Sequence, residues 1–503
     1  MVWDVIIVGA GVVGALTARE LARHELRVLV IEAEPDAAMG ATKSNSAIVH
    51  GGFAEGPETL RGRLGAAGRR LFPALEDELG FGFRPIGSLV LSFSDDDAPL
   101  RRLFDRGRAN GLADLELWSG DRIREHEPHV NPDVKAGLWC AGAGICSPWD
   151  LAYAALENAV AHGVEFLPRQ KVVRVEGPLA GKGRWRLSTA DRAFEARFVI
   201  NAAGFGGGAL DALAGLSDST ISPRTGEYVI FAQGTGALVN SVLFQVPGPL
   251  GKGVLVAPTY FGNLLVGPDA RNEDAAAPGL RDTHADRLAA LLSQAAHVVG
   301  GIDMKKAIRS FTGVRAAARS GDFLVGAADP ARLPGWHRAV GIQSPGLTAS
   351  PALAKLLVEG LAADGLELRP RADFDGARRS KPAHLLRTSW LPFAEADAAT
   401  RLPEGDPGRM VCRCEQVRER DLAAAYAREL PVTTVDALKR RTRAGMGWCQ
   451  GQFCRPRVAA WLERRAGAEA VLEDDVTRSG LHRVAGKELR SVLSATDSRD
   501  LRD

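Results

Sequence analysis

The stretch Val2–Glu32, VWDVIIVGAGVVGALTARELARHELRVLVIE, decides the fold of the first part of the chain. It begins with an apolar run at residues 5–8, continues with the turn GAGVVG at 9–14 and a helical pattern at 15–24, and ends with a second apolar run and Glu32. This order of strand, glycine turn, helix, strand and acid is typical of a Rossmann-like dinucleotide-binding unit. We therefore expect an α/β domain that binds a dinucleotide, not an ordinary glycine-rich turn.

The glycines and the acid of this stretch have separate expected roles. Gly9 makes the tight turn, Gly11 lets the backbone approach a pyrophosphate, and Gly14 lets the helix pack against the strand. The pyrophosphate would lie at the helix N-terminus, where unpaired N–H groups and the helix dipole favour negative charge. Glu32, eighteen residues after Gly14, is expected to accept hydrogen bonds from the adenosine ribose.

Composition limits the class of protein. A chain of 503 residues predicts two or three domains, and 46% hydrophobic with 25% charged residues is typical of a soluble globular protein. The net charge of +2 argues against nucleic acid or an anionic membrane as the main partner. No apolar run approaches the roughly 20 residues of a transmembrane helix, no signal peptide is evident, and six cysteines are too few for a disulfide framework. We expect a cytoplasmic protein.

Three further segments are expected to complete the cofactor site. The polar loop at residues 34–56 follows the second strand and should lie at the ligand-binding edge of the sheet, with Ser46 at the cofactor and His50 facing its ring. A histidine that only hydrogen-bonds a loop carbonyl is the alternative for His50. The other two segments are a buried strand that ends in small residues and a second helix N-terminus, which would face the part of a flavin that gains negative charge on reduction. They contain Ala203 and Gly204, and Gly346, Leu347 and Thr348.

The middle of the chain has a different pattern. Apolar runs at 228–231, 253–256 and 264–267 predict an antiparallel, strand-rich cap over the substrate. Residues 60–80 predict one helix with Arg61, Arg63, Arg69 and Arg70 outside. Residues 369–406, rich in Pro, Asp, Ala and Arg, are expected to form a surface linker.

Four cysteines near the C-terminus form the second strong motif. They are arranged as CxC and CxxxxC, thirty-four residues apart: Cys412, Cys414, Cys449 and Cys454. Zinc sites prefer CxxC pairs, whereas four cysteines in a chain that binds a redox dinucleotide favour a 2Fe–2S cluster; zinc and free thiols remain alternatives. The helices at 421–429 and 435–443 would bring the pairs together, and loop N–H groups at 443–447 would bond the sulfurs.

The basic run KRRTR at residues 439–443 has three interpretations. It could offset the negative charge of the cluster, dock an acidic partner, or be solvated at a helix C-terminus.

Two parts of the chain resemble known families. The first ~370 residues resemble the glycine/D-amino-acid oxidase superfamily of FAD oxidoreductases, and NSAIVHGG at 45–52, TGEY at 225–228 and GVRA at 313–316 are similar to the L-2-hydroxyglutarate dehydrogenase branch. Residues 411–457, with RTRAGMGWCQGQFC, resemble the bacterioferritin-associated-ferredoxin-like (BFD-like) domain of the FAD-dependent, anaerobic glycerol-3-phosphate dehydrogenases. Ser344-Pro345-Gly346 stands where those enzymes carry a lysine for the substrate phosphate.

This resemblance implies an α/β fold in which a Rossmann-like FAD-binding domain carries an antiparallel β-rich substrate cap and a small helical iron–sulfur domain. The implied FAD-dependent part covers residues 1–370, with FAD-binding segments at about 1–80, 145–220 and 311–370 and cap segments at about 81–144 and 221–310. A linker at 371–408, a BFD-like [2Fe–2S] domain at 409–468 and a C-terminal tail at 469–503 follow.

The implied activity is an FAD- and 2Fe–2S-dependent dehydrogenase of a small anionic hydroxy compound. His50 would take the hydroxyl proton, and Arg315 would bind a carboxylate or phosphate unless it forms only a structural ion pair. The sequence holds one complete dinucleotide motif, so no separate NAD domain is expected. Electrons would therefore pass through the cluster to a partner subunit or a quinone. Association with a membrane would be peripheral and through that partner. Without the lysine, kcat/KM is expected to be higher for a dicarboxylic hydroxy acid than for glycerol 3-phosphate, unless Lys43 or Lys252 binds the phosphate.

Two other classes remain alternatives. The first is an amine-oxidising subunit acting on a D-amino acid, proline or an opine, because such relatives share the flavin fold and also present an arginine to the substrate. The second is a non-catalytic electron-transfer or iron-handling adaptor, although an adaptor needs neither the intact dinucleotide motif nor a large cap.

Overall fold

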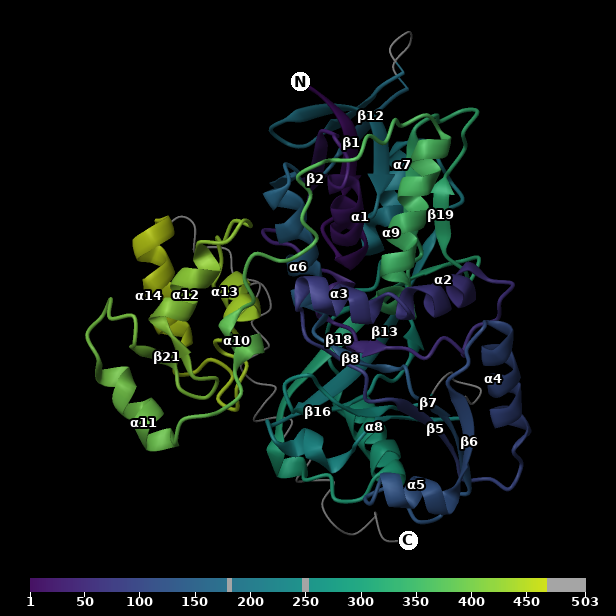
Figure 1. Ribbon diagram of the computed structural model, residues 1–503, viewed down its shortest axis with the longest axis vertical. Coiled ribbons are helices and arrows are strands. Elements are labelled where there is room, and N and C mark those ends of the chain that lie inside the picture. Colours follow the sequence, from purple (N-terminus) through teal and green to yellow (C-terminus); the bar gives the residue numbers. More distant parts are fainter. Residues whose placement is uncertain (179–182, 247–252, 468–503) are drawn as a thin grey trace.

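The structure is a computed structural model that describes residues 1–178, 183–246 and 253–467. Figure 1 shows three parts. The nucleotide-binding part contains β1 and β12, the cap is built on a second sheet, and the C-terminal part, in green and yellow, lies at the side of the other two.

The nucleotide-binding part is built on an eight-stranded sheet. Its centre has the order β20–β12–β1–β2–β9 and is entirely parallel, and β10, β11 and β19 extend it in antiparallel pairing. The strands are β1 (Val2–Val8), β2 (Val28–Ile31), β9 (Glu165–Leu167), β10 (Arg174–Glu176), β11 (Trp185–Ser188), β12 (Ala193–Asn201), β19 (Leu324–Ala327) and β20 (Trp336–Val340). The predicted parallel strands and the glycine turn between β1 and α1 are confirmed.

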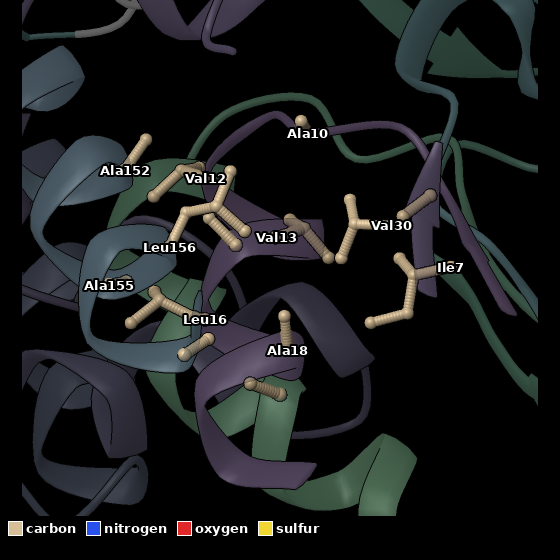
Figure 2. Packing of buried hydrophobic residues seen from close by; sticks show 14 of the residues in the cluster. Ile7, Ala10, Val12, Val13, Leu16, Ala18, Val30, Ala152, Ala155 and Leu156 are labelled. Atoms are coloured by element: carbon tan, nitrogen blue, oxygen red, sulfur yellow. The ribbon is translucent and has the colours of Figure 1, made fainter. Parts of the chain in front are cut away.

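Helices cover one face of this sheet and a tryptophan-rich cluster covers the other. Val5 and Ile7 of β1 pack in one cluster with α1 (Val12–Ala22), α6 (Pro148–Ala161) and α9 (Gly346–Ala363). Figure 2 shows Ile7 beside residues of α1 and α6. Ile6 points the other way, toward Trp185 and Trp336, beside α7 (Gly207–Leu213). Because both faces are buried, the strands are apolar throughout, as expected for a parallel sheet.

The cap is built on a nine-stranded sheet that is antiparallel except for the β5–β14 pair. Its strands are β5 (Ser88–Ser92), β6 (Leu115–Ser119), β7 (Ala136–Cys140), β13 (Ile221–Phe231), β14 (Val242–Gln245), β15 (Val256–Pro258), β16 (Leu264–Val266), β17 (Arg271–Asn272) and β18 (Ala307–Ala318). Helices α4 (Ala98–Ala109), α5 (Gly120–His126) and α8 (Ala285–Val298) pack around it, and the small sheet β3 (Ile48–Val49), β8 (Gly144–Cys146) and β4 (Phe83–Arg84) joins it to the first part. The boundary expected at residue 311 falls inside β18.

The single helix predicted for residues 60–80 is wrong. The structure has two helices, α2 (Leu60–Arg69) and α3 (Phe72–Leu79), with Pro73 in the first turn of α3. Arg69, predicted to be outside, is buried, because its guanidinium pairs with Asp114 at 2.8 Å.

The C-terminal part is small and mostly helical. It contains the hairpin β21 (Met410–Cys412) and β22 (Val417–Arg418) and the helices α12 (Glu419–Tyr426), α13 (Val435–Thr442) and α14 (Arg455–Ala466). The linker before it carries α10 (Ala383–Leu386) and α11 (Phe393–Ala398), while the expected tail from residue 469 lies outside the described residues. No helix in the described ranges has the length and apolar character needed to cross a membrane.

A buried ion-pair network joins the C-terminal part to the nucleotide-binding part. Arg440 and Arg441 of α13 reach Asp36, in the loop after β2, at 3.0 and 2.7 Å. Tyr153 of α6 donates a hydrogen bond to the same carboxylate at 2.8 Å. Burial alone would raise the pKa of the Asp36 carboxyl, but Arg441 and Arg440 hold that pKa below its usual value.

The solvated interpretation of the basic run is therefore wrong for its arginines. Arg440, Arg441 and Arg443 are all buried, and Arg443 pairs with Glu415 at 2.8 Å. Lys439 is half-buried at the cavity described below, and burial together with Arg309 lowers its pKa to about 7.

We predict that Asp36→Asn weakens the docking of the C-terminal part. The change leaves two buried guanidinium groups without their carboxylate, which typically costs about 3–5 kcal/mol. Limited proteolysis of the holoenzyme should then cut the linker at residues 371–408 faster than in the wild type.

The matched control is Glu367→Gln, which removes an exposed pair with Arg369 and should leave the cleavage rate unchanged. Equal cleavage rates for wild type and Asp36→Asn would contradict the docking role of the network.

Candidate functional site

One large cavity, of about 2320 Å³, lies where the three parts meet. The glycine turn and Glu32 line it from the nucleotide-binding part, Arg315 lines it from the cap, and Lys439 and Gln450 line it from the C-terminal part. Its size and its three walls make it the natural place for an extended cofactor and a substrate.

The glycine turn has the geometry that a dinucleotide requires. Gly9 has φ +109°, and an added Cβ there would lie 2.4 Å from the carbonyl oxygen of Ala202. A Cβ on Gly14 would lie 2.0 Å from the carbonyl oxygen of Gly9, so the helix can approach the strand only with glycine at this position. Gly11 is the N-cap of α1 and has no side chain to cap the helix. The N–H of Val12 donates to Thr42 Oγ1 at 3.0 Å, and the next N–H groups of the first turn can bind an anion.

Glu32 ends β2 at the same cavity and is held by the backbone. Its carboxylate accepts hydrogen bonds from the N–H groups of Ala10, at 2.8 Å, and of Glu34, at 3.0 Å. Burial raises the pKa of this carboxyl above its usual value. Each carboxylate oxygen has further lone pairs, so the group can also accept hydroxyl donors from the cavity.

His50 lies at the cavity and is fixed from several sides. Its backbone N–H donates to Thr348 Oγ1 at 2.9 Å, and its ring stacks on Phe244 with centroids 5.7 Å apart. Its Nε2 lies 3.5 Å from Ser344 Oγ. This last contact was missed by the sequence analysis, which treated Ser344 only as the replacement of a lysine.

Arg315 of β18 reaches the cavity beside two cap residues. It donates to the carbonyl oxygen of Asp269 at 3.0 Å and hydrogen-bonds the phenol of Tyr228, whose ring stacks on Phe311 at 4.6 Å. Tyr260 also lines the cavity, and the guanidinium carbon of Arg84 lies over the Tyr260 ring, 4.8 Å from its centre.

The remaining predicted cofactor residues lie around the same cavity. Ser46, Ala203, Gly204, Gly346 and Leu347 line it directly, and the hydroxyl of Thr348 accepts the hydrogen bond from His50 described above. Lys43 lines it as well, whereas Lys252 lies outside the described residues. The structure therefore brings together residues from four distant stretches of sequence.

The four C-terminal cysteines form two pairs. Cys414 and Cys449 have their sulfurs 3.5 Å apart, and Cys412 hydrogen-bonds Cys454. Each pair takes one cysteine from the CxC motif and one from the CxxxxC motif. Two pairs of thiolates are the arrangement that a 2Fe–2S cluster requires, with one pair for each iron.

Backbone N–H groups surround these sulfurs. The N–H of Gly445 points to Cys412, as predicted for the loop at 443–447. The Cys414 thiol and the N–H groups of residues 451–453 lower the pKa of Cys449 to about 5. A Cβ on Gly447 would lie 2.4 Å from that of Cys414, so this turn can close over the site only with glycine. The residues present therefore fit a cluster held by thiolates.

Fold and site together define a dinucleotide-dependent redox protein with an iron–sulfur domain, and comparison with known proteins agrees. The model of the DAO family, described as FAD dependent oxidoreductase, matches residues 4–360, and the model of the BFD-like [2Fe-2S] binding domain matches residues 410–464. The chain belongs to the DAO family of FAD dependent oxidoreductases, and its cofactors are FAD and a 2Fe–2S cluster.

Three relatives illustrate the similarity. Glycerol 3-phosphate dehydrogenase of Caloramator mitchellensis is 37% identical over 470 residues, covering 93% of this chain and 95% of its own. The solved, FAD-bound L-alpha-glycerophosphate oxidase of Mycoplasma pneumoniae has a TM-score of 0.70 at 30% identity and covers 75% of this chain and 98% of its own. L-2-hydroxyglutarate dehydrogenase of Caenorhabditis elegans is 30% identical over 283 residues, which is 53% of this chain and 63% of its own.

These relatives confirm the expected activity class, a dehydrogenase acting on a CH–OH group of a small anionic compound. Neither the amine-oxidising alternative nor the adaptor alternative gains support. A solved glycine oxidase from Geobacillus kaustophilus, for example, is similar at 24% identity, which shows the fold alone.

We predict that Glu32→Ala weakens FAD binding without unfolding the chain. Losing hydrogen bonds between a carboxylate and the ribose should cost about 1.5–3 kcal/mol, or roughly 10- to 150-fold in affinity. Equilibrium dialysis of the purified variant, with released FAD measured by its fluorescence, checks this.

Glu25→Ala, an exposed change in the same βαβ unit, is the control and should retain FAD like the wild type. Stoichiometric FAD in Glu32→Ala after dialysis would show that the ribose is held elsewhere.

Proposed function

We propose that this protein oxidises the secondary alcohol of glycerol 3-phosphate, with a hydroxy dicarboxylic acid such as 2-hydroxyglutarate as the second candidate. The observation that carries this choice is the similarity to a glycerol 3-phosphate dehydrogenase over both the FAD-dependent part and the iron–sulfur domain. The hydroxyglutarate relative matches only about half of the chain. This order reverses the one suggested by the missing lysine at Ser344–Gly346.

His50 is proposed as the base that takes the proton of the substrate hydroxyl. A neutral imidazole can accept this proton when it lies within hydrogen-bond reach of the alcohol. The contact with Ser344 Oγ and the stacking on Phe244 fix the ring at the cavity, so that the proton acceptor is already oriented when the substrate enters. FAD supplies the hydride acceptor, and the cluster supplies a one-electron acceptor.

Arg315 is proposed to bind the anionic group of the substrate. Its planar guanidinium can donate two parallel hydrogen bonds to a carboxylate or phosphate. The carbonyl oxygen of Asp269 and the phenol of Tyr228 hold this side chain at the cavity wall. Both partners are uncharged groups, so these two contacts leave the positive charge of the guanidinium in place.

The iron–sulfur domain is proposed to pass electrons to a partner subunit or a quinone. Two residues of the iron–sulfur domain touch the cap. Gln450, which follows Cys449, accepts a hydrogen bond from Arg309 at 3.4 Å. Arg443 lies 3.7 Å from the ring centre of Phe261 and pairs with Glu415, which follows Cys414. These contacts support a cluster close to the cavity. We also propose a cytoplasmic location, with membrane association only through such a partner.

We predict that wild-type holoenzyme reduces its flavin with glycerol 3-phosphate, and that His50→Ala and Arg315→Ala fail in different ways. His50→Ala should mainly lower kcat, because the base acts in the chemical step. Arg315→Ala should raise KM by hundreds-fold or more, because unpairing a desolvated anion costs about 3–5 kcal/mol. Steady-state assays with an artificial dye acceptor measure both.

The same assay decides the substrate when it includes 2-hydroxyglutarate, other hydroxy acids and amino acids. A kcat/KM tenfold higher for 2-hydroxyglutarate than for glycerol 3-phosphate would reverse the proposed order, and an unchanged KM in Arg315→Ala would make that residue structural. Flavin reduction by amino acids alone would restore the amine-oxidising class.

We predict that Cys449→Ser separates the two half-reactions. Anaerobic substrate should still bleach the flavin at the wild-type rate, whereas turnover with the acceptor partner or a quinone should slow, because one cluster ligand is altered. Cys140→Ala, a buried thiol that does not line the cavity, is the control. Equal loss in both half-reactions would assign the cluster a structural role only.

A further inference from the structure

The turn that carries Cys449 has one side toward the cavity and another toward solvent. Met446 and Gln450 line the cavity, whereas the side chain of Trp448, between them in the sequence, is 56% exposed. The iron–sulfur domain therefore has an outer side in addition to the side that faces the FAD site.

The cysteine pair beside Trp448 is also the more exposed of the two pairs. Cys414 and Cys449 are partly exposed, whereas the other two cluster cysteines are buried. Gly447, which precedes Trp448, packs on Cys414, as its 2.4 Å approach to that side chain shows. Because electron transfer slows steeply with distance, an external acceptor would receive electrons fastest at this pair.

The linker brings two more exposed aromatic side chains to the same turn. The N–H of Leu391 donates to Gln416 Oε1 at 2.9 Å, and Gln416 Nε2 donates to the carbonyl oxygen of Leu391 at 2.7 Å. Trp390 and Phe393, which flank Leu391 in the sequence, are both exposed. Gln416 lies two residues after Cys414, so this linker segment runs along the exposed cysteine pair.

Exposed aromatic side chains gather on this side of the molecule. Of the four exposed Phe and Trp side chains among the described residues, three lie here, and Leu386 is exposed in the same linker segment. We call these four residues the outer patch: Leu386, Trp390, Phe393 and Trp448. Figure 1 shows α11, which begins at Phe393, on the side of the C-terminal part away from the other two parts. Grouped apolar side chains on a surface mark interaction sites, whereas single ones do not.

The outer patch lies among positive charges. Arg387 donates hydrogen bonds to two backbone carbonyl oxygens and Arg457 donates to one, so these contacts leave both charges in place. The two stretches that carry the outer patch, residues 386–393 and 446–457, contain three arginines and no Asp or Glu. An acidic surface is the electrostatic complement of this region.

Helix α11 does not reverse this charge. Its Asp397 pairs with Arg413 at 2.6 Å. Glu395 of the same helix is exposed, which sets one carboxylate against the arginines described above. The outer side of the iron–sulfur domain therefore remains positive.

The composition and shape of the outer patch suit a protein better than a quinone. Trp and Arg are enriched among the residues that contribute most to protein–protein binding. A small ring such as a quinone is mostly enclosed by its site, whereas the four side chains of the outer patch are each about half exposed.

We propose that the outer patch is the docking site of an acidic electron-accepting protein, which takes electrons from the cluster at the Cys414–Cys449 pair. The inference rests on the proposed transfer of electrons to a partner and names the chemistry of that partner. The reduced flavin gives up two electrons, which reach two one-electron acceptors singly through the cluster, and its protons pass to water.

The probe for this site is cytochrome c in two forms. The native protein is basic, whereas succinylation replaces its lysine amines by carboxylates and keeps the same haem, whose ferric iron takes up one electron. Holoenzyme that has been reduced chemically and freed of reductant should reduce the succinylated form at least about tenfold faster than the native form at low ionic strength. This difference should shrink as salt is raised to about 0.5 M.

Two variants remove aromatic side chains of the outer patch. Trp448→Ala and Phe393→Ala should each slow reduction of succinylated cytochrome c about tenfold, and should weaken its binding to oxidised holoenzyme by a similar factor. Surface plasmon resonance measures the binding. Phe393 is remote in sequence from every cluster cysteine, so this variant tests the surface without altering a residue next to a ligand. The cluster absorption and the reduction of a small dye should match the wild type in both variants.

Leu117→Ala is the matched control. Leu117 is an exposed apolar residue of β6 in the cap, which Figure 1 shows far from the C-terminal part. This variant should bind and reduce both cytochromes like the wild type.

Four results would overturn the inference. The first two are equal rates for the two cytochromes at low ionic strength and unchanged binding in both patch variants. Loss of soluble-quinone reduction in step with cytochrome reduction would assign the outer patch to a quinone, and a dimer that Trp448→Ala dissociates would assign it to a second copy of the chain. Failure of glycerol 3-phosphate to reduce the flavin would reject the proposed function alone, because chemically reduced holoenzyme needs no substrate.

Discussion

The buried network around Asp36 is the interaction on which the arrangement of the two redox parts depends. It joins the loop after β2 to α13, more than 400 residues later in the chain, through Arg440 and Arg441. A buried carboxylate with two guanidinium partners and a tyrosine is stable only in one geometry, because each group left unpaired would be strongly destabilising. The network therefore fixes the iron–sulfur domain against the wall of the FAD-dependent part.

This docking makes the iron–sulfur domain a wall of the cavity as well as an electron carrier. Lys439, Arg443 and Gln450 line the cavity directly. The contacts of Gln450 with Arg309 and of Arg443 with Phe261 link the iron–sulfur domain to the cap. A change at this interface can therefore affect both the shape of the substrate site and the path of electrons, and assays of the separate half-reactions are needed to tell the effects apart.

Local patterns predicted the parts of the structure that local physics determines. The strands β1 and β2, the glycine turn and each of the two cysteine motifs follow from residues within one short stretch. The break between α2 and α3 was missed although Pro73, favoured in a first helical turn, was an available signal. The partners of Asp36 had no such signal, since a buried ion pair between distant segments leaves no periodicity in the sequence.

The same limit explains why Arg315 was singled out from the sequence but its neighbours in the cap were not. Arg315 belongs to a recognisable GVRA motif, whereas Tyr228 and the carbonyl oxygen of Asp269 reach it only through the folding of the cap. The register of β13 against β18 is fixed by alternation, because a shift by one residue would move Glu227 and Val229 away from their partners at α8 to the face that now carries Tyr228. Ser344, at the position of the absent lysine, instead contacts His50. The loop before α9 therefore contacts the proposed base, and such a contact between residues 294 positions apart leaves no signal in the sequence.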